Sequence, residues 1–109
     1  RLPNGNLILV DNGNLHNPPS SRAVEYEVNE AARTATLVWS FEPGVFSCCM
    51  GSVQRLPGGN TLIALGQDYR VFEVSPSERV VWELRVADRR AELFGIYRAF
   101  RIPSLYVGI

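Results

Sequence analysis

The chain has 109 residues, 46% of them hydrophobic, which is typical of one globular domain with a modest core. Eleven basic and eleven acidic residues give a formal net charge of zero, so the charge balance does not favour nucleic acid or an anionic membrane surface as a partner. No apolar run approaches the roughly 18 residues of a membrane-spanning helix, and no signal segment is visible. We therefore expect no membrane insertion.

The first half of the chain predicts three strands. A turn with Pro3, Gly5 and Asn6 precedes an apolar run at 7–11, which predicts a strand after a tight reversal. Residues 23–29 alternate between apolar and polar side chains, which predicts a half-buried strand with Glu25 and Glu27 on a solvated outer face. A third strand is expected at 34–42. It carries its apolar residues on one face: Leu37, Trp39 and Phe41.

The second half predicts four more strands, at about 48–56, 61–66, 70–75 and 79–86, and another at 95–102. It also repeats the first half. The turn that begins at Arg1 recurs at Arg55, 54 residues later, and Trp39 has a counterpart 43 residues later in Trp82. Arg101 begins a third, shorter copy of the Arg-Leu-Pro turn as Arg-Ile-Pro. We interpret both tryptophans as packing residues.

Repeats of this length made of strands and turns are typical of β-propeller blades. The sequence therefore predicts an all-β fold: a β-propeller segment of about two four-stranded blades. In this partial domain, 1–47 is a blade that lacks its first strand, 48–94 is a full blade, and 95–109 holds the first strand of a further or shared blade. Open strand edges invite pairing, so the expected partners are the remaining propeller blades or copies of the chain itself.

The connection at 12–21 is eight residues longer than its counterpart in the second copy, so function is expected there first. Asp11, Asn12 and Asn14 resemble calcium ligands, but a turn uses the same residue types, and we favour the turn. Cys48 and Cys49 are adjacent, which is not metal-ligand spacing. We favour two partly buried thiols over a vicinal disulfide or an intermolecular bridge.

Several segments in order resemble the arylsulfotransferase-like propellers: Asp11-Asn12-Gly13-Asn14, residues 21–28, residues 36–41, residues 50–66 and residues 97–106. The resemblance covers nearly the whole chain. It implies a six-bladed propeller of which this chain forms the C-terminal blades, and a periplasmic or secreted setting. It also implies transfer of a sulfuryl group from an aryl sulfate to a phenol through a sulfohistidine, without a nucleotide sulfate donor.

The resemblance also suggests site residues. His16 stands where these enzymes have an arginine shortly after the Asp-Asn-Gly turn, and Arg22 lies close enough in the chain to supply a guanidinium, so both are candidate catalytic residues. Asn12 and Asn14 are candidate substrate-binding residues. A histidine expected between 66 and 71 is absent from the sequence. No cofactor and no metal are expected.

Whether the chain is an enzyme stays open at this point, because most of the catalytic residues that the resemblance implies are not in it. Two alternatives to the sulfotransferase remain. One is a non-catalytic propeller scaffold. The other is a self-assembling structural protein in which the terminal strand, 95–102, is exchanged between copies.

Overall fold

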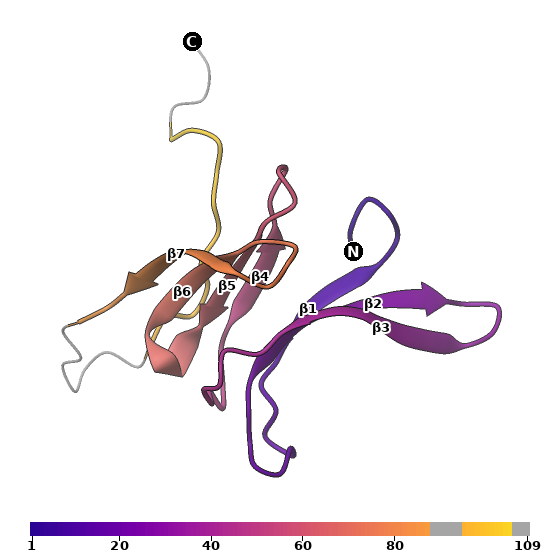
Figure 1. The fold of residues 1–109 in the computed structure, drawn as a ribbon, viewed down its shortest axis with the longest axis horizontal. Helices are drawn as coiled ribbons and strands as arrows, with labels where there is room; N and C mark the ends of the chain where they lie inside the picture. The colour runs from indigo at the N-terminus through magenta and orange to yellow at the C-terminus, as the bar shows by residue number, and fades with distance from the viewer. Residues whose placement is uncertain (88–94, 106–109) are drawn as a thin grey trace.

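The computed structural model describes residues 1–87 and 95–105, which form two antiparallel sheets (Figure 1). The first sheet has the strand order β1 (Leu7–Asp11), β2 (Arg22–Asn29), β3 (Thr34–Phe41). The second has the order β4 (Ser52–Arg55), β5 (Thr61–Leu65), β6 (Arg70–Val74), β7 (Val80–Arg85). Helix in the described part is limited to the 3-10 turn η1 (Gly66–Asp68).

The repeated turn in the sequence is the same turn in the structure. The Leu2 N–H donates to the Asn6 carbonyl at 2.8 Å, and the Leu56 N–H donates to the Asn60 carbonyl at 2.8 Å. Gly5 and Gly59 hold equivalent places with φ of 91° and 94°, a backbone conformation that glycine adopts without steric cost. β1 and β5 therefore leave matching turns and are equivalent strands.

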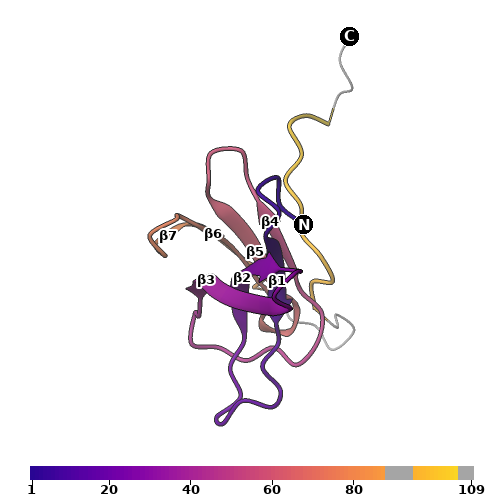
Figure 2. The same ribbon diagram turned by 90° about the vertical axis from the view of Figure 1, so that its right-hand side faces the viewer.

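The main core lies between the two sheets. Ala23 and Phe41 of the first sheet pack against Ile63, Leu65 and Phe72 of the second, with the Phe41 and Phe72 rings edge to face at a centroid distance of 6.0 Å. Figure 2 views the two sheets from the side of the first sheet. β1 and β4 are the strands of the two sheets that lie closest to each other.

A smaller core lies on the opposite face of the second sheet, because successive side chains of a strand alternate between faces. Leu62, Ala64 and Val71 point to this face and are covered by Ile96 and Ala99. The segment 95–105, which we call the tail, thus crosses the face of the second sheet that is remote from the first. The predicted strand at 95–102 is not part of either sheet ladder.

The all-β prediction is confirmed, and the seven predicted strands up to residue 86 are all present. Their ends are shifted by one residue at most, except that β4 begins four residues later than expected. The described residues form two sheets and not a closed ring. The predicted blade boundaries stay predictions, and part of the ranges 48–94 and 95–109 lies outside the described residues. The described part of the chain contains no helix with the length and apolar character needed to span a membrane.

The expectation that Glu25 lies on a solvated face is wrong. Its side chain is only 7% exposed, because the second sheet covers that face of β2 and brings Arg55 to it. Glu27, two residues further along β2, is exposed as expected. The alternation was correct, but the first sheet has a partner on the face that carries Glu25.

Candidate functional site

Three connections gather at one end of the two sheets: the loop after β1, the connector between β3 and β4, and η1 (Figure 1). The tight turns that begin at Leu2 and Leu56 lie at the other end. The loop end carries all four residues that the sequence suggested as site residues, so its geometry decides what they can do.

Asp11 brings His16 and Arg22 together. The Arg22 Nε donates to Asp11 Oδ2 at 2.9 Å, and His16 Nε2 lies 3.3 Å from the same oxygen. Burial alone would raise the pKa of Asp11, but the hydrogen bonds from Arg22 and the Gly13 N–H and the nearby His16 outweigh it, so the pKa lies below its ordinary value. The hydrogen bond to Asp11 in turn raises the pKa of Arg22. The centre of this cluster is an ionised carboxylate.

Gly13 makes this loop geometry possible. Its φ is +71°, and a Cβ at this position would lie 1.7 Å from the Ser20 carbonyl oxygen and 2.9 Å from His16 Nδ1. Only glycine lets the two ends of the loop approach so closely. The Asp-Asn-Gly turn therefore places His16 over Asp11.

The two candidate asparagines have different surroundings. The Asn12 side-chain nitrogen donates to the carbonyls of Ser47 at 2.8 Å and Met50 at 3.0 Å, so it fastens the connector to the loop. Asn12 also borders an open cavity of about 420 Å³ with Met50, Tyr97 and Arg98. Asn14 is exposed, and its side chain has no hydrogen-bond partner among the described residues. A substrate-binding role for either residue stays a prediction.

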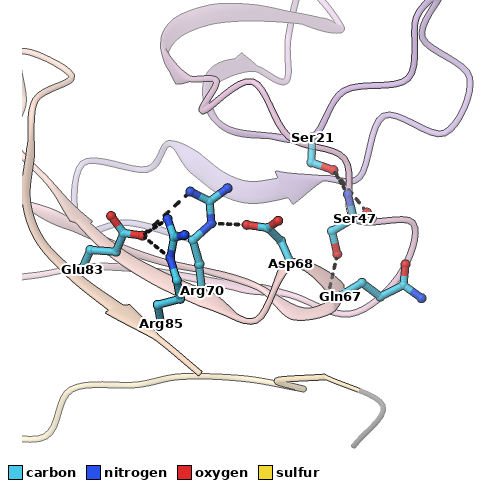
Figure 3. A network of polar contacts seen from close by, with 7 residues as sticks. All are labelled: Ser21, Ser47, Gln67, Asp68, Arg70, Glu83 and Arg85. Carbon is cyan, nitrogen blue, oxygen red and sulfur yellow. Dashed lines mark hydrogen bonds and ion pairs between the residues drawn. The ribbon is translucent and has the colours of Figure 1, made fainter. Parts of the chain in front are cut away.

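Two fully buried serines hold the connector in place (Figure 3). The Ser47 N–H donates to Ser21 Oγ at 2.8 Å, and the Ser21 hydroxyl lies 2.8 Å from the Asn12 carbonyl. The Gln67 N–H donates to Ser47 Oγ at 3.1 Å, which links η1 to the same point. The loop, the connector and η1 are thus joined through two hydroxyls that water cannot reach.

Cys48 and Cys49 form a disulfide with each other, so the favoured expectation of two thiols is wrong. That expectation assumed a strand from residue 48, in which neighbouring side chains point to opposite faces. β4 begins only at Ser52, and the cysteines lie in the irregular connector, where alternation does not apply.

An ion-pair network occupies the place where the resemblance led us to expect a histidine (Figure 3). Arg70 pairs with Asp68 through Nε, and its Nη1 lies 3.8 Å from Glu83 Oε1. The Arg70 guanidinium also lies over the Phe72 ring, 5.0 Å from its centroid. Arg85 pairs with the same Glu83 oxygen at 3.1 Å. Acidic partners therefore surround the charge of Arg70.

Sequence reasoning missed a four-residue contact between the sheets, which we call the first clamp: Asn6, Glu25, Trp39 and Arg55. The Asn6 side-chain nitrogen donates to Glu25 Oε1 at 2.7 Å, and Arg55 Nη2 donates to Glu25 Oε2 at 2.6 Å. The Arg55 guanidinium lies 5.5 Å from the centroid of the Trp39 ring. The Trp39 indole N–H donates to the Pro76 carbonyl of the second sheet at 3.2 Å.

The same contact recurs at equivalent positions between the second sheet and the tail, as the second clamp: Asn60, Glu73, Trp82 and Arg101. Asn60 donates to Glu73 Oε1 at 2.9 Å, and Arg101 donates to Glu73 Oε2 at 2.5 Å. The Arg101 guanidinium lies 5.6 Å from the Trp82 centroid. The repeated turns and tryptophans of the sequence align three residues of each clamp, the asparagine, the tryptophan and the arginine. The equivalence of Glu25 and Glu73 appears only in the strand register, where they pair with the equivalent residues Ile8 and Leu62.

Both clamp carboxylates have pKa values below the ordinary one. Burial would raise the pKa of Glu25, but hydrogen bonds from Asn6 and Arg55 more than compensate. For Glu73, the hydrogen bond from Asn60 is the largest influence and that from Arg101 the next, and both lower its pKa. The clamps therefore hold ionised carboxylates against arginine at neutral pH.

The loop end thus offers an imidazole and a guanidinium on one carboxylate. The open cavity is bordered by the neighbouring Asn12 and not by these three side chains. Within residues 1–87 and 95–105, no three His, Cys, Asp or Glu side chains lie close enough together to hold a metal ion. The arrangement suits proton transfer and the binding of an anion.

A family model described as Arylsulfotransferase (ASST) matches residues 1–93. No curated protein matches the chain.

Proposed function

Because the chain belongs to the arylsulfotransferase family, we propose that it forms part of a β-propeller that transfers a sulfuryl group from an aryl sulfate to a phenol. The propeller is supported by the two repeated sheets, which pack face to face as neighbouring blades would. It is also supported by the clamp between them, which recurs between the second sheet and the tail. The observation that carries the activity is the placement of His16 and Arg22 on one carboxylate at the loop end.

Sulfuryl transfer needs a nucleophile, a proton donor for the leaving phenolate, and cations near the sulfuryl oxygens. Arg22 suits the role of the cation near the sulfuryl oxygens, because only its Nε is bound to Asp11 and its terminal nitrogens bind no described residue. His16 suits the role of proton donor to the leaving group, because its Nε2 lies 3.3 Å from Asp11 Oδ2, which orients the imidazole. His16 is the one histidine of the sequence, so the attacking histidine would come from further blades.

The proposal implies small aryl sulfates and phenols as ligands, further propeller blades or copies of the chain as partners, and no cofactor. It also implies a periplasmic or secreted setting. Asp11 has a consequence for binding. A sulfate group that approaches Arg22 must share the guanidinium with this carboxylate, so affinity for the free inorganic ion should be weak.

The test is the release of nitrophenolate from 4-nitrophenyl sulfate by the assembled protein, with and without a phenol acceptor. We expect the acceptor to raise the rate, and His16→Gln to lower it by about 100-fold. Arg22→Lys should lower the rate as well, since lysine lacks the bidentate fork. Arg79→Met, at an exposed hairpin, is the matched control and should leave the rate unchanged. No turnover by the folded, assembled wild type would contradict the proposal.

A second candidate is a non-catalytic propeller that binds ligands. The observation that favours it is the pairing of Arg70 with Asp68 and Glu83 where a catalytic histidine was expected. This candidate predicts that 4-nitrophenyl sulfate binds, by calorimetry, to a protein that does not hydrolyse it. Binding that His16→Gln weakens, together with absent turnover, would select the scaffold over the enzyme.

A further inference from the structure

The Cys48–Cys49 disulfide contributes little to overall stability, because it joins two neighbouring residues. A disulfide stabilises a fold mainly by closing loops of the unfolded chain, and the gain falls as the loop shortens. This ring encloses a single peptide unit, so it takes little conformational freedom from the unfolded chain. The rest of the fold therefore does not require the bond, and its main effect lies in the folded connector.

One side chain holds the connector on both sides of the disulfide. The two amide hydrogens of Asn12 go to the carbonyls of Ser47 at 2.8 Å and Met50 at 3.0 Å, and these carbonyls flank the two cysteines. The path of the main chain through the ring sets the distance between the carbonyls. Asn12 therefore binds both of them only while that path is kept.

The main chain of the ring itself is also bound. The Cys48 N–H donates to Gln67 Oε1 of η1 at 3.3 Å, and the Ser47 hydroxyl donates to the Cys49 carbonyl at 3.1 Å. A change of the backbone at the two cysteines is therefore transmitted to the loop after β1 through Asn12, and to η1 through Gln67.

Met50, directly after the disulfide, has a backbone conformation that its surroundings impose. Its φ is +62°, which a residue with a side chain adopts only where neighbouring contacts hold it there. It also packs against η1, since a Cβ at Gly66 would lie 2.7 Å from the Met50 Cβ. Opening the ring removes one of the restraints on Met50. The backbone can then relax to a common conformation, which carries the Met50 carbonyl away from Asn12.

The disulfide is accessible to a reductant. Cys49 is exposed and Cys48 is half-buried, and neither takes part in a sheet ladder. They lie in the connector between β3 and β4, at the loop end of the sheets (Figure 1). Exposed disulfides are reduced more readily than buried ones. The sequence has no other cysteine, so the thiol chemistry of the chain is confined to this pair.

We propose that Cys48 and Cys49 form a reversible redox site, which a dithiol reduces and whose state controls how firmly the loop after β1 is fastened to the connector. A thiolate of the dithiol attacks Cys49 Sγ, the S–S bond breaks, and Cys48 leaves as a thiolate that takes up a proton. The second thiol of the reductant then displaces Cys49, which is protonated in turn, and the reductant becomes a cyclic disulfide. Two electrons and two protons pass to the chain.

The oxidised form keeps both hydrogen bonds of Asn12, and the reduced form loses the one to Met50. Asn12 follows Asp11 in the chain, and Asp11 holds His16 and Arg22, so reduction loosens the loop that carries the candidate site. The redox site goes beyond sulfuryl transfer. Its tests follow the loop itself, so their outcome does not depend on whether the protein turns over an aryl sulfate.

The first test is hydrogen exchange of the full chain, oxidised and after reduction with dithiothreitol. The amides of Ser47 and Gln67 donate to the hydroxyls of Ser21 and Ser47, so they report on the connector. We expect them to exchange about 10-fold faster in the reduced chain, while the amides of β5 keep their rates. Equal rates in the two forms, or a disulfide that dithiothreitol reduces only when the chain unfolds, would overturn the proposal.

The control for the reductant is the chain with both Cys48→Ser and Cys49→Ser, which has no sulfur pair to reduce. It should exchange at the rates of the reduced wild type, with and without dithiothreitol. Rates equal to those of the oxidised wild type would show that the ring does not hold the connector.

The second test asks whether the effect passes through Asn12. His16 is the one histidine of the sequence, so its imidazole gives a single nuclear magnetic resonance signal from the same loop. Reduction should shift this signal in the wild type. Asn12→Leu removes both donors, so the loop is already unfastened and reduction should leave the signal in place. Asn14→Leu, at an exposed asparagine of the same loop, is the matched control and should keep the shift. Equal shifts in Asn12→Leu and wild type would refute the coupling.

Discussion

The guanidinium of Arg55 and the carboxylate of Glu25 are 2.6 Å apart and join the end of one sheet to the middle of the other. The carboxylate is nearly buried, and Asn6 donates to its second oxygen. A buried carboxylate that loses its cation keeps the cost of desolvation without the compensating attraction. This pair should therefore control how firmly the two sheets hold together.

We expect Arg55→Met to lower the free energy of unfolding by about 2 to 3 kcal/mol, because it leaves the buried Glu25 carboxylate without a cation and with asparagine side chains as its remaining partners. Arg55→Lys should cost less, since it keeps the charge. Urea denaturation at pH 7 measures both. Arg79→Met, which replaces an exposed arginine, should change the value by less than about 0.5 kcal/mol. A loss from Arg55→Met no larger than that of the control would refute this role.

The second clamp should hold the tail and not the sheets. Arg101→Met removes the partner of Glu73 and the guanidinium over Trp82, while the hydrogen bonds within the second sheet stay intact. We expect faster hydrogen exchange at the amides of Ala99 and Arg101, which donate to Ser52 and Gln54, and unchanged exchange in β5. Exchange that rises equally in the tail and in β5 would mean that Arg101 stabilises the whole chain.

The strands and turns could be predicted because their signals are local. Alternation at Val24 and Tyr26 and the paired Gly5 and Gly59 turns each depend on a few neighbouring residues. The clamps could not be predicted in this way, since Glu25 and Arg55 are 30 residues apart and meet only when the sheets pack. Alternation assigns a side chain to a face but does not say what covers that face.

For the same reason, only part of the candidate site could be predicted from the sequence. His16 and Arg22 could be named because they lie in one long loop, but their shared contact with Asp11 depends on the reversal of the chain at Gly13. The fastening role of Asn12 depends on the connector, which is distant in sequence. The Cys48–Cys49 disulfide was missed because the start of β4 was placed four residues too early.

Gly13→Ala should disrupt the loop that carries His16. The new Cβ would meet the Ser20 carbonyl, and alanine is strained at a φ of +71°. We expect a loss of about 2 kcal/mol or more in the free energy of unfolding, and a loss of the close approach of His16 to Asp11 in nuclear Overhauser spectra. Gly58→Ala is the matched control, since no atom lies within 4 Å of its Cβ position, and it should be nearly neutral. Similar losses in both variants would refute this explanation.

Acid should weaken the fold through Asp11, Glu25 and Glu73, whose pKa values are lowered in the folded chain. A lowered folded pKa contributes stability above the unfolded value, and this stability is lost as the pH falls through the folded value. We therefore expect the free energy of unfolding to decrease below about pH 4.5. Glu25→Gln should be less stable than wild type at pH 7, and the difference should shrink by pH 3. A difference that stays constant between these pH values would contradict the assignment.

The tail is recognised in two different ways, and this difference should be visible in evolution. Ser52 and Gln54 bind only main-chain atoms, so almost any side chain at position 99 or 101 satisfies them. The charge of Arg101, in contrast, is matched to Glu73 alone. Related chains should therefore exchange the residues at 73 and 101 together, while a change at 52 needs no compensating change in the tail.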